Sequence, residues 1–239
     1  QHLELINFCK RKKIEFLSTP YDVEDAKLLA KHGIKKFKTS SADLTDYFLH
    51  NFLSKNAKQV IISTGMSNLK EISNTLKVYN RKKTKIILLH CISNYPCSDN
   101  SLNLNNITTL KNSFKLPVGF SDHSDNKLAA ITAMGLGCRV IERHITLSKK
   151  MKGPDHLASD DPEQFKNYVK LIRNNEQILG DFKKKKQKEE IEMLNISRKG
   201  IYYLKDHKKG KKVTSKNLFL RRPWGGLSVF NIKKILKHR

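Results

Sequence analysis

Two histidines stand where they could hold a metal ion. His123 and His144 each lie just past a short run of mostly apolar residues. Neutral imidazoles with open coordination positions beside them suit divalent ions such as Mn²⁺, Zn²⁺ or Fe²⁺. From this pattern alone, two loop histidines held only by hydrogen bonds are an equally good interpretation. His90 also ends such a run, next to Cys91, and we expect it in the core or behind the ligands.

A second set of polar residues could bind a phosphate group. It consists of hydroxyl side chains and one lysine: Thr19, Lys38, Ser41, Ser63, Ser93 and Ser121. Hydroxyls, a lysine and free backbone N–H groups at helix starts are the groups that bind phosphate. Taken singly, each serine is more often a helix N-cap. The glycine-rich signatures G-x-G-x-x-G and G-x-x-x-x-G-K are absent, which excludes the usual nucleotide-binding loops.

The residues alone do not decide the role of two short motifs. Asp155 in Gly153-Pro154-Asp155-His156 could accept hydrogen bonds from sugar hydroxyls, although a plain turn fits these residues well. Arg222, in Arg221-Arg222-Pro223, is an ordinary surface residue unless something else places it.

These residues follow a repeated strand–helix pattern. Short β-branched or apolar runs recur along the chain, with helical periodicity between them. The predicted strands are 14–17, 36–39, 60–62, 86–89, 117–120 and 139–142. The predicted helices are 22–32, 67–79, 127–134 and 163–179. Alternating units of this kind indicate an α/β fold with a parallel sheet and helices outside it.

Every predicted strand leads into polar residues. The last three strands lead into His90, His123 and His144, in that order. In a parallel α/β protein the carboxyl ends of the strands form the active site. Small polar residues often begin loops, which would explain polar residues after any one strand. It does not explain why all six predicted strands are followed by them. We therefore expect these residues to share one site.

The character of the sequence changes after Gly180. A charged stretch, 183–192, leads to Ile201-Tyr202-Tyr203, Val213 and Leu218-Phe219-Leu220, a pattern that predicts short strands and turns. We expect one domain over 1–182, a linker over 183–197 and a small domain over 198–239.

The composition of the chain argues against nucleic acid and membranes as partners. The chain has 239 residues, with 47 lysines and arginines against 22 acidic residues. From Asp181 onward 19 basic residues face 5 acidic ones, with few aromatic residues among them. This favours a solvated basic surface over nucleic-acid binding. No apolar run approaches the roughly 20 residues of a transmembrane helix, so we expect no membrane partner. Four cysteines without a CxxC pair indicate reduced thiols in a cytoplasmic protein.

Six motifs in chain order resemble the N-acetylneuraminate (sialic acid) synthase family, which includes legionaminate and pseudaminate synthases. They are Phe16-Leu17-Ser18-Thr19-Pro20, Ser63-Thr64-Gly65-Met66, Leu89-His90-Cys91 with Tyr95-Pro96, Gly119-Phe120-Ser121-Asp122-His123, Ile141-Glu142-Arg143-His144 and Gly153-Pro154-Asp155-His156. The resemblance implies a (β/α)8 TIM barrel followed by a small SAF (antifreeze-like) domain. Six strands cannot close an eight-stranded barrel, so we expect the first two strands before Gln1 and only part of the small domain here.

The resemblance also implies a reaction. Phosphoenolpyruvate would condense with an open-chain N-acylated mannosamine-type sugar, giving a nine-carbon 2-keto sugar acid and phosphate for cell-surface polysaccharide biosynthesis. The enolpyruvate C3 attacks the sugar aldehyde, water is added at C2, and C–O cleavage releases phosphate. The enzyme would be a C–C bond-forming transferase and a domain-swapped homodimer.

Site residues follow from the same resemblance. His123 and His144 match the ligands of a divalent metal, for which we expect Mn²⁺, and Glu142 lies beside them. Lys38 matches the residue that holds phosphoenolpyruvate, surrounded by Thr19, Ser41, Ser63, Ser93 and Ser121. Tyr95 and Asp155 match contacts to the amino sugar, and Arg222 matches an arginine delivered into the neighbouring subunit's site. Asp43 stands at a catalytic position where the family often has Glu.

Other departures concern the small domain. Arg198-Lys199-Gly200 replaces the usual Arg-Arg-Ser, and Ile196 stands where an aromatic residue can line the sugar pocket. These departures leave the acyl sugar open. The alternative hypothesis is an inactive fragment or pseudoenzyme that binds sugar or partner chains without turnover.

Overall fold

The computed structural model describes residues 2–225 and 228–237. The chain divides into two units, Gln1–Gly180 and Asp181–Arg239, and each is described by itself. Residues 1, 226, 227, 238 and 239 of the two predicted domains lie outside the described residues.

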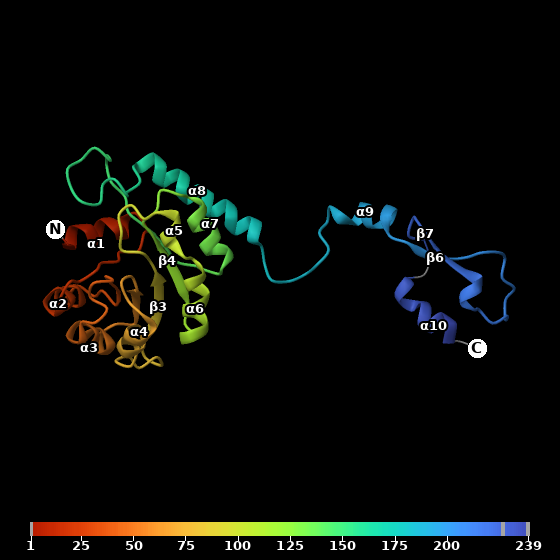
Figure 1. Cartoon of the computed structure of the whole chain (residues 1–239), viewed down its shortest axis with the longest axis horizontal. Helices are drawn as coiled ribbons and strands as arrows, with labels where there is room; N and C mark the ends of the chain where they lie inside the picture. Colours follow the sequence, from red (N-terminus) through yellow and green to blue (C-terminus); the bar gives the residue numbers. More distant parts are fainter. Residues whose placement is uncertain (1, 226–227, 238–239) are drawn as a thin grey trace. The chain divides into compact units, whose positions relative to one another are not determined.

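A parallel five-stranded sheet forms the centre of the first unit. Its strands lie in the order of the chain, and each one pairs in parallel with the next. They are β1 (Lys36–Thr39), β2 (Gln59–Ser63), β3 (Lys85–His90), β4 (Val118–Asp122) and β5 (Ile141–Arg143). The sheet curls, with helices along its outer side (Figure 1). The predicted α/β fold with a parallel sheet is thereby confirmed.

Helices connect the strands, and several of the helices of this unit begin with a side-chain cap. Asp22 and Asp46 cap α2 and α3, and Asn68 with Glu71 forms a capping box at α4. The helices of this unit are α1 (His2–Arg11), α2 (Val23–Lys31), α3 (Tyr47–Asn56), α4 (Leu69–Leu76), α5 (Asp99–Leu102), α6 (Asn105–Phe114), α7 (Leu128–Gly135) and α8 (Pro162–Leu179). The four predicted helices correspond to α2, α4, α7 and α8.

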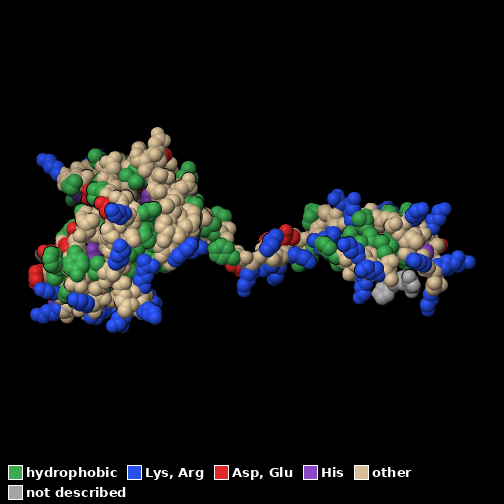
Figure 2. Space-filling view, turned by 60° about the horizontal axis from the view of Figure 1, so that its bottom comes forward, with side chains coloured by type: hydrophobic (Ala, Val, Ile, Leu, Met, Phe, Trp, Pro, Cys, Tyr) green, Lys and Arg blue, Asp and Glu red, His purple; other side chains and the backbone are tan. Residues whose placement is uncertain are grey.

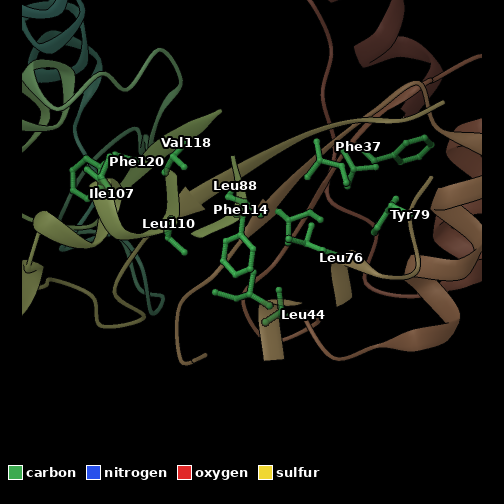
Figure 3. Packing of buried hydrophobic residues seen from close by; sticks show 14 of the residues in the cluster. Phe37, Leu44, Leu76, Tyr79, Leu88, Ile107, Leu110, Phe114, Val118 and Phe120 are labelled. Atoms are coloured by element: carbon green, nitrogen blue, oxygen red, sulfur yellow. The ribbon is translucent and has the colours of Figure 1, made fainter. Parts of the chain in front are cut away.

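The hydrophobic core lies between the outer face of the sheet and these helices. Side chains on a strand alternate between the two faces, so Phe37, Ile62, Leu88 and Phe120 point outward and are fully buried. Figure 3 shows several of these residues packed against core residues from the helices and loops. Fully burying one side chain of this size contributes about 1.5–3 kcal/mol. The core therefore fixes the strands and leaves their inner face for other residues.

The predicted strand at 14–17 is wrong. The segment is extended, but only one backbone hydrogen bond joins this region to β1, from Lys38 N–H to Ser18 O at 3.3 Å. Ile14 and Leu17 are exposed, so this short run gains little from a place in the sheet. The last strand is also shifted, because β5 begins at Ile141 rather than at residue 139.

Gly119 allows β5 to approach β4 closely. A Cβ at this position would lie 2.5 Å from the carbonyl oxygen of Val140 and 2.7 Å from Leu89 Cδ2. Both distances are too short for a side chain, so only glycine fits without a shift of the backbone. The approach brings the ends of β4 and β5 together, where the two predicted metal ligands lie.

The second unit contains a small antiparallel pair of strands. β6 (Gly200–Tyr203) pairs with β7 (Leu218–Arg221), which confirms the predicted short strands in this segment. The Tyr202 hydroxyl donates to the carbonyl of Pro223 at 2.8 Å. The unit also holds α9 (Glu190–Ser197), η1 (Ser215–Asn217), η2 (Val229–Asn231) and α10 (Ile232–Lys237). Helix α9 lies within the segment 183–197 that we expect to act as a linker.

Positive charge is spread over the surface of both units. Figure 2 shows lysine and arginine side chains distributed among other residue types on the visible face. This distribution agrees with a solvated basic surface. In the described ranges, no helix combines the length and the apolar character needed to cross a membrane.

Candidate active site

A cavity of about 390 Å³ opens at the carboxyl ends of the parallel strands. It is lined by Thr19, Tyr21, Lys38, Ser40, Ser41, Ser63, Cys91, Tyr95, Ser121, His123, Glu142, Arg143, His144 and Asp155. Because carboxyl ends of parallel strands meet at one edge of a sheet, residues far apart in the sequence converge here. Most residues expected to share one site line this single cavity.

Two buried serine hydroxyls have no hydrogen-bond partner in the described part of the chain. They belong to Ser63, which ends β2 and lines the cavity, and to Ser93, which follows β3 and is not part of the cavity lining. A third buried hydroxyl without a partner, that of Thr39, lies at the end of β1 on the outer face of the sheet. A Cβ on Gly65 would lie 2.5 Å from Ser93 Oγ, 2.8 Å from Ser41 Oγ and 3.0 Å from Cys91 Sγ. The backbone N–H of Gly65 donates to Ser41 Oγ at 3.0 Å. Buried polar groups normally find a partner, so unpaired hydroxyls beside a cavity indicate a place for a polar ligand.

Lys38 and Glu142 face each other across the cavity. The Lys38 Nζ lies 3.4 Å from Glu142 Oε1, and both side chains are largely shielded from solvent. The Ser121 hydroxyl donates to the same carboxylate at 2.7 Å. Lys38 lies on β1, Ser121 on β4 and Glu142 on β5, so the curl of the sheet brings a cation and a carboxylate together. The lysine can neutralise an anionic substrate, and the carboxylate can receive a proton.

The ring of His123 is held with one nitrogen open. Its Nδ1 lies 2.7 Å from the carbonyl oxygen of Ile92, which can only accept, so Nδ1 carries the proton. Nε2 lies 3.2 Å from Ser121 Oγ, but the single O–H of Ser121 is directed to Glu142. The Nε2 lone pair therefore receives no proton from Ser121. Burial lowers the pKa of His123, chiefly by desolvation, despite the opposing hydrogen bond to Ile92.

His144 lies beside His123 and close to the predicted sugar contacts. The two imidazole centroids are 5.3 Å apart with the rings nearly perpendicular. His144 Nδ1 is 3.8 Å from Asp155 Oδ2, and the Tyr95 ring lies 4.2 Å from that of His123. Burial is the first cause that raises the pKa of Tyr95, so its phenol stays protonated and can donate a hydrogen bond.

The residues present fit a divalent ion held by two imidazoles. His123 has the arrangement common in metal sites, with one nitrogen fixed by a carbonyl and the other facing the cavity. Among the residues that the structure describes, no group of three or more His, Cys, Asp or Glu side chains is arranged around a metal position. An ion bound here would thus leave several coordination positions to water and substrate.

Some predicted site residues lie elsewhere. The Asp43 carboxylate accepts a hydrogen bond from the Ser40 hydroxyl at 2.6 Å and does not line the cavity, whereas Ser40 does. Arg222 follows β7 in the second unit. His90 is buried, its Nε2 lies 2.7 Å from the Leu102 carbonyl, and its ring stacks on Phe120. The expectation of a core position for His90 is confirmed.

Four residues of the cavity were not singled out from the sequence. Tyr21 follows the Thr19-Pro20 motif, Ser40 precedes Ser41, and Cys91 and Arg143 lie inside recognised motifs. Strand alternation could not have indicated Arg143, because it places this side chain on the face opposite Glu142 and His144.

The chain is similar in sequence to known synthases. Residues 1–184 match the model of the NeuB family. The chain is 41% identical over 238 residues to the N,N'-diacetyllegionaminic acid synthase of Campylobacter jejuni, covering 98% of this chain and 71% of that protein. It is 38% identical to the synthase of the same name from Legionella pneumophila, covering 100% of this chain and 68% of that protein.

A solved structure shares the architecture. The N-acetylneuraminic acid (sialic acid) synthetase of Leptospira borgpetersenii, in complex with citrate, superposes with a TM-score of 0.75 at 32% sequence identity. The match covers 81% of this chain and 68% of that chain.

Proposed function

Because the chain belongs to the NeuB family of sialic acid and related synthases, we propose that it condenses phosphoenolpyruvate with an open-chain N-acylated mannosamine-type sugar. The enolpyruvate C3 forms a bond to the aldehyde carbon, whose oxygen takes up a proton. Water adds at C2, and the C2–O bond to phosphate breaks. The products are a nine-carbon 2-keto sugar acid and phosphate.

One observation carries this proposal: the buried Ser63 hydroxyl has no partner in the lining of a cavity that also holds Lys38, and the unpaired Ser93 hydroxyl lies next to Gly65, where Ser41 and Cys91 of the same lining also lie. A phosphate or carboxylate oxygen would satisfy both hydroxyls, and Lys38 would offset its charge. Charge-assisted hydrogen bonds of this kind are about twice as strong as neutral ones. The same contacts would hold the enolpyruvate in one orientation, which lowers the entropic part of the barrier.

Glu142 is the group we assign to proton transfer. It is held by Ser121 and lies between Lys38 and the two histidines. In this position it would take the proton from the water that adds at C2. Asp43 would act indirectly, by fixing the hydroxyl of Ser40 at the edge of the cavity.

His123 and His144 would hold the divalent metal, for which we propose Mn²⁺. When bound, such an ion acts as a Lewis acid toward an oxygen of the substrate. Tyr95 and Asp155, next to the histidines, would contact the acylated amino sugar. The phenol of Tyr95 donates and the Asp155 carboxylate accepts, which suits an acyl carbonyl and sugar hydroxyls.

The assembly is also part of the proposal. The curled sheet would form part of a (β/α)8 barrel, and the second unit would form part of an SAF domain. In a domain-swapped homodimer, Arg222 would then reach the site of the neighbouring subunit. The four cysteines are free thiols, which supports a reducing cytoplasmic setting.

The test is release of phosphate from phosphoenolpyruvate by the chain in the presence of Mn²⁺. The sugars are N-acetylmannosamine and diacetylated amino sugars of the legionaminic and pseudaminic type. We expect release that depends on one of these sugars. Phosphoenolpyruvate with ¹⁸O in the bridging position should yield labelled phosphate, because the C–O bond breaks. Label retained in the sugar acid would contradict the proposed cleavage. Binding of both substrates without release would favour the alternative of a binding protein without turnover.

A further inference from the structure

A buried polar network lies on the outer side of the two strands that carry His123 and His144. Strand pairing places Ser121 opposite Glu142 on the inner face, and Asp122 opposite Arg143 one residue further on. Because side chains alternate, Asp122 and Arg143 point away from the cavity wall that Ser121 and Glu142 form. The Arg143 side chain is only 3% exposed and that of Asp122 is fully buried.

The guanidinium of Arg143 binds the backbone on both sides of His123. Its Nη1 donates to the carbonyl oxygen of Asp122 at 3.2 Å and also to that of Ser124. These two carbonyls belong to the residues immediately before and after His123. Arg143 itself immediately precedes His144. One side chain therefore joins the backbone around the first histidine to the backbone of the second.

Asp160 completes the link to His144. Its carboxylate receives two hydrogen bonds from Arg143, Nε to Oδ2 at 3.2 Å and Nη2 to Oδ1 at 2.9 Å. Its backbone N–H donates to the carbonyl of His144 at 3.0 Å, and its own carbonyl accepts from Thr146 N–H at 2.9 Å. Asp160 thus orients the guanidinium with its side chain and holds His144 with its backbone.

Asp122 ties the same network to helix α8. Its Oδ2 accepts a hydrogen bond from the Tyr168 hydroxyl at 2.8 Å, and its Oδ1 accepts from Ser124 N–H and Oγ–H at 2.9 and 2.7 Å. The guanidinium carbon of Arg143 lies 5.5 Å from the centre of the Tyr168 ring. Both oxygens of the Asp122 carboxylate are therefore engaged, Oδ2 by helix α8 and Oδ1 by Ser124 just after β4.

Such a network is a poor way to gain stability alone. Removing charges from water carries a penalty that can exceed their attraction, and well-packed apolar residues often stabilise a fold as well or better. What the network does provide is direction, since a guanidinium forms hydrogen bonds only along fixed lines in its plane. Those lines end on the backbone next to the two histidines.

We propose that Arg143 is a positioning residue that fixes His123 and His144 at the separation needed to share one divalent ion. This inference rests on the proposed function. Asp160 orients Arg143, and Asp122 with Tyr168 anchors the far side of the network.

The test compares Mn²⁺ affinity, measured by calorimetry on the full chain, between the wild type and Arg143→Lys. Lysine keeps the charge but cannot bind the two carbonyls and the carboxylate together. We expect Mn²⁺ to bind about 10–100-fold more weakly, as for other residues that orient metal ligands. Phosphoenolpyruvate affinity without metal should stay unchanged, because Ser63 and Ser93 lie on or after other strands. Arg139→Lys, at an exposed position before β5, is the matched control and should leave both affinities unchanged.

A second variant guards against misfolding. Asp160→Asn keeps the backbone contacts to His144 and Thr146 but loses the charge that orients the guanidinium, so we expect a smaller loss of Mn²⁺ affinity. A folded Arg143→Lys that binds Mn²⁺ like the wild type would overturn the positioning role alone. Equal losses of Mn²⁺ and phosphoenolpyruvate affinity would overturn it in favour of a general structural role. A wild type that binds phosphoenolpyruvate but no Mn²⁺ would overturn the metal proposal and this inference together.

Discussion

The two faces of the parallel sheet differ in what happens to their polar groups. On the outer side, the buried His50 has Nδ1 2.6 Å from the Tyr79 hydroxyl and Nε2 3.1 Å from the Asp43 carbonyl. On the inner side, His123 has one nitrogen fixed and the other open to the cavity, and the hydroxyls of Ser63 and Ser93 are unpaired. On the outer face the Thr39 hydroxyl is also buried and unpaired, so what distinguishes the inner face is that its open groups border a cavity. The inner face leaves several of them for a ligand.

This contrast separates histidines that sequence patterns cannot separate. His90 and His123 both follow buried runs, yet His90 stacks on Phe120 in the core and His123 faces the cavity. Burial by itself is shared by both residues. What distinguishes them is where each ring lies, because His123 lines the cavity and His90 does not.

The largest expected effect comes from the inner face. His123→Ala removes the nitrogen that we assign to the metal, so turnover with Mn²⁺ should be abolished while the far-UV circular dichroism stays close to that of the wild type. The matched variant on the outer face is His90→Gln, which should retain turnover. Full activity in His123→Ala would remove the basis for the metal assignment.

Ile62 and Ser63 are neighbours on opposite faces of β2 and allow a direct comparison. Ile62→Ala deletes a fully buried core side chain, so the free energy of unfolding should fall by about 2–5 kcal/mol. The KM for phosphoenolpyruvate should not change, because Ile62 points away from the cavity. Urea unfolding and steady-state kinetics on the same preparation check both parts. A raised KM at unchanged stability would mean that the two faces are not separate in function.

Arg222 belongs to the second unit and tests whether that unit contributes to the site. In the proposed homodimer, Arg222→Ala should raise the KM for the sugar about tenfold, as expected for one lost hydrogen bond to a polar group, and should affect phosphoenolpyruvate less. Its neighbour Arg221, at the end of β7, provides the control, since Arg221→Ala should change neither constant. The reverse pattern, with phosphoenolpyruvate more affected than sugar, would contradict the placement of Arg222.

The smallest expected effect is a pH dependence of stability from the outer face. Burial lowers the pKa of His50 and of His90, so both are neutral in the folded protein at pH values where the unfolded chain binds protons. Their contribution is fully present above about pH 6.5 and is lost as the pH falls. Between pH 7.5 and 5.5 the free energy of unfolding should therefore fall. His90→Gln should flatten this slope, and an unchanged slope would show that His90 does not contribute.

Much of the fold was predictable because the strands are short apolar runs separated by turn signals. The strands around Phe37, Val60 and Leu88 were placed to within a residue or two. The segment around Phe16 has the same local pattern, and only the lack of a continuous hydrogen-bonded partner excludes it from the sheet. Helix α6 was not predicted, because its many Asn and Thr residues have low helix propensity and its buried face at Ile107 and Leu110 stabilises it by packing.

The sequence predicted most of the residues that line the cavity, but not the contacts that these residues make. Strand ends marked Lys38, Ser63 and Ser121 correctly as cavity residues. Asp43 has the right chemistry and a neighbouring position, yet a turn directs its carboxylate to Ser40. The roles of Arg143 and Asp160 depend on contacts between segments that no local pattern encodes.

The account is tested most directly by the double variant Ser63→Ala/Ser93→Ala, with phosphoenolpyruvate affinity and unfolding free energy measured on one sample. If the inner face keeps these hydroxyls for a ligand, affinity should fall about 10–100-fold, while stability should rise by about 1 kcal/mol because two unpaired buried groups are gone. Unchanged affinity, or stability that falls together with it, would contradict the assignment of these two hydroxyls to a ligand.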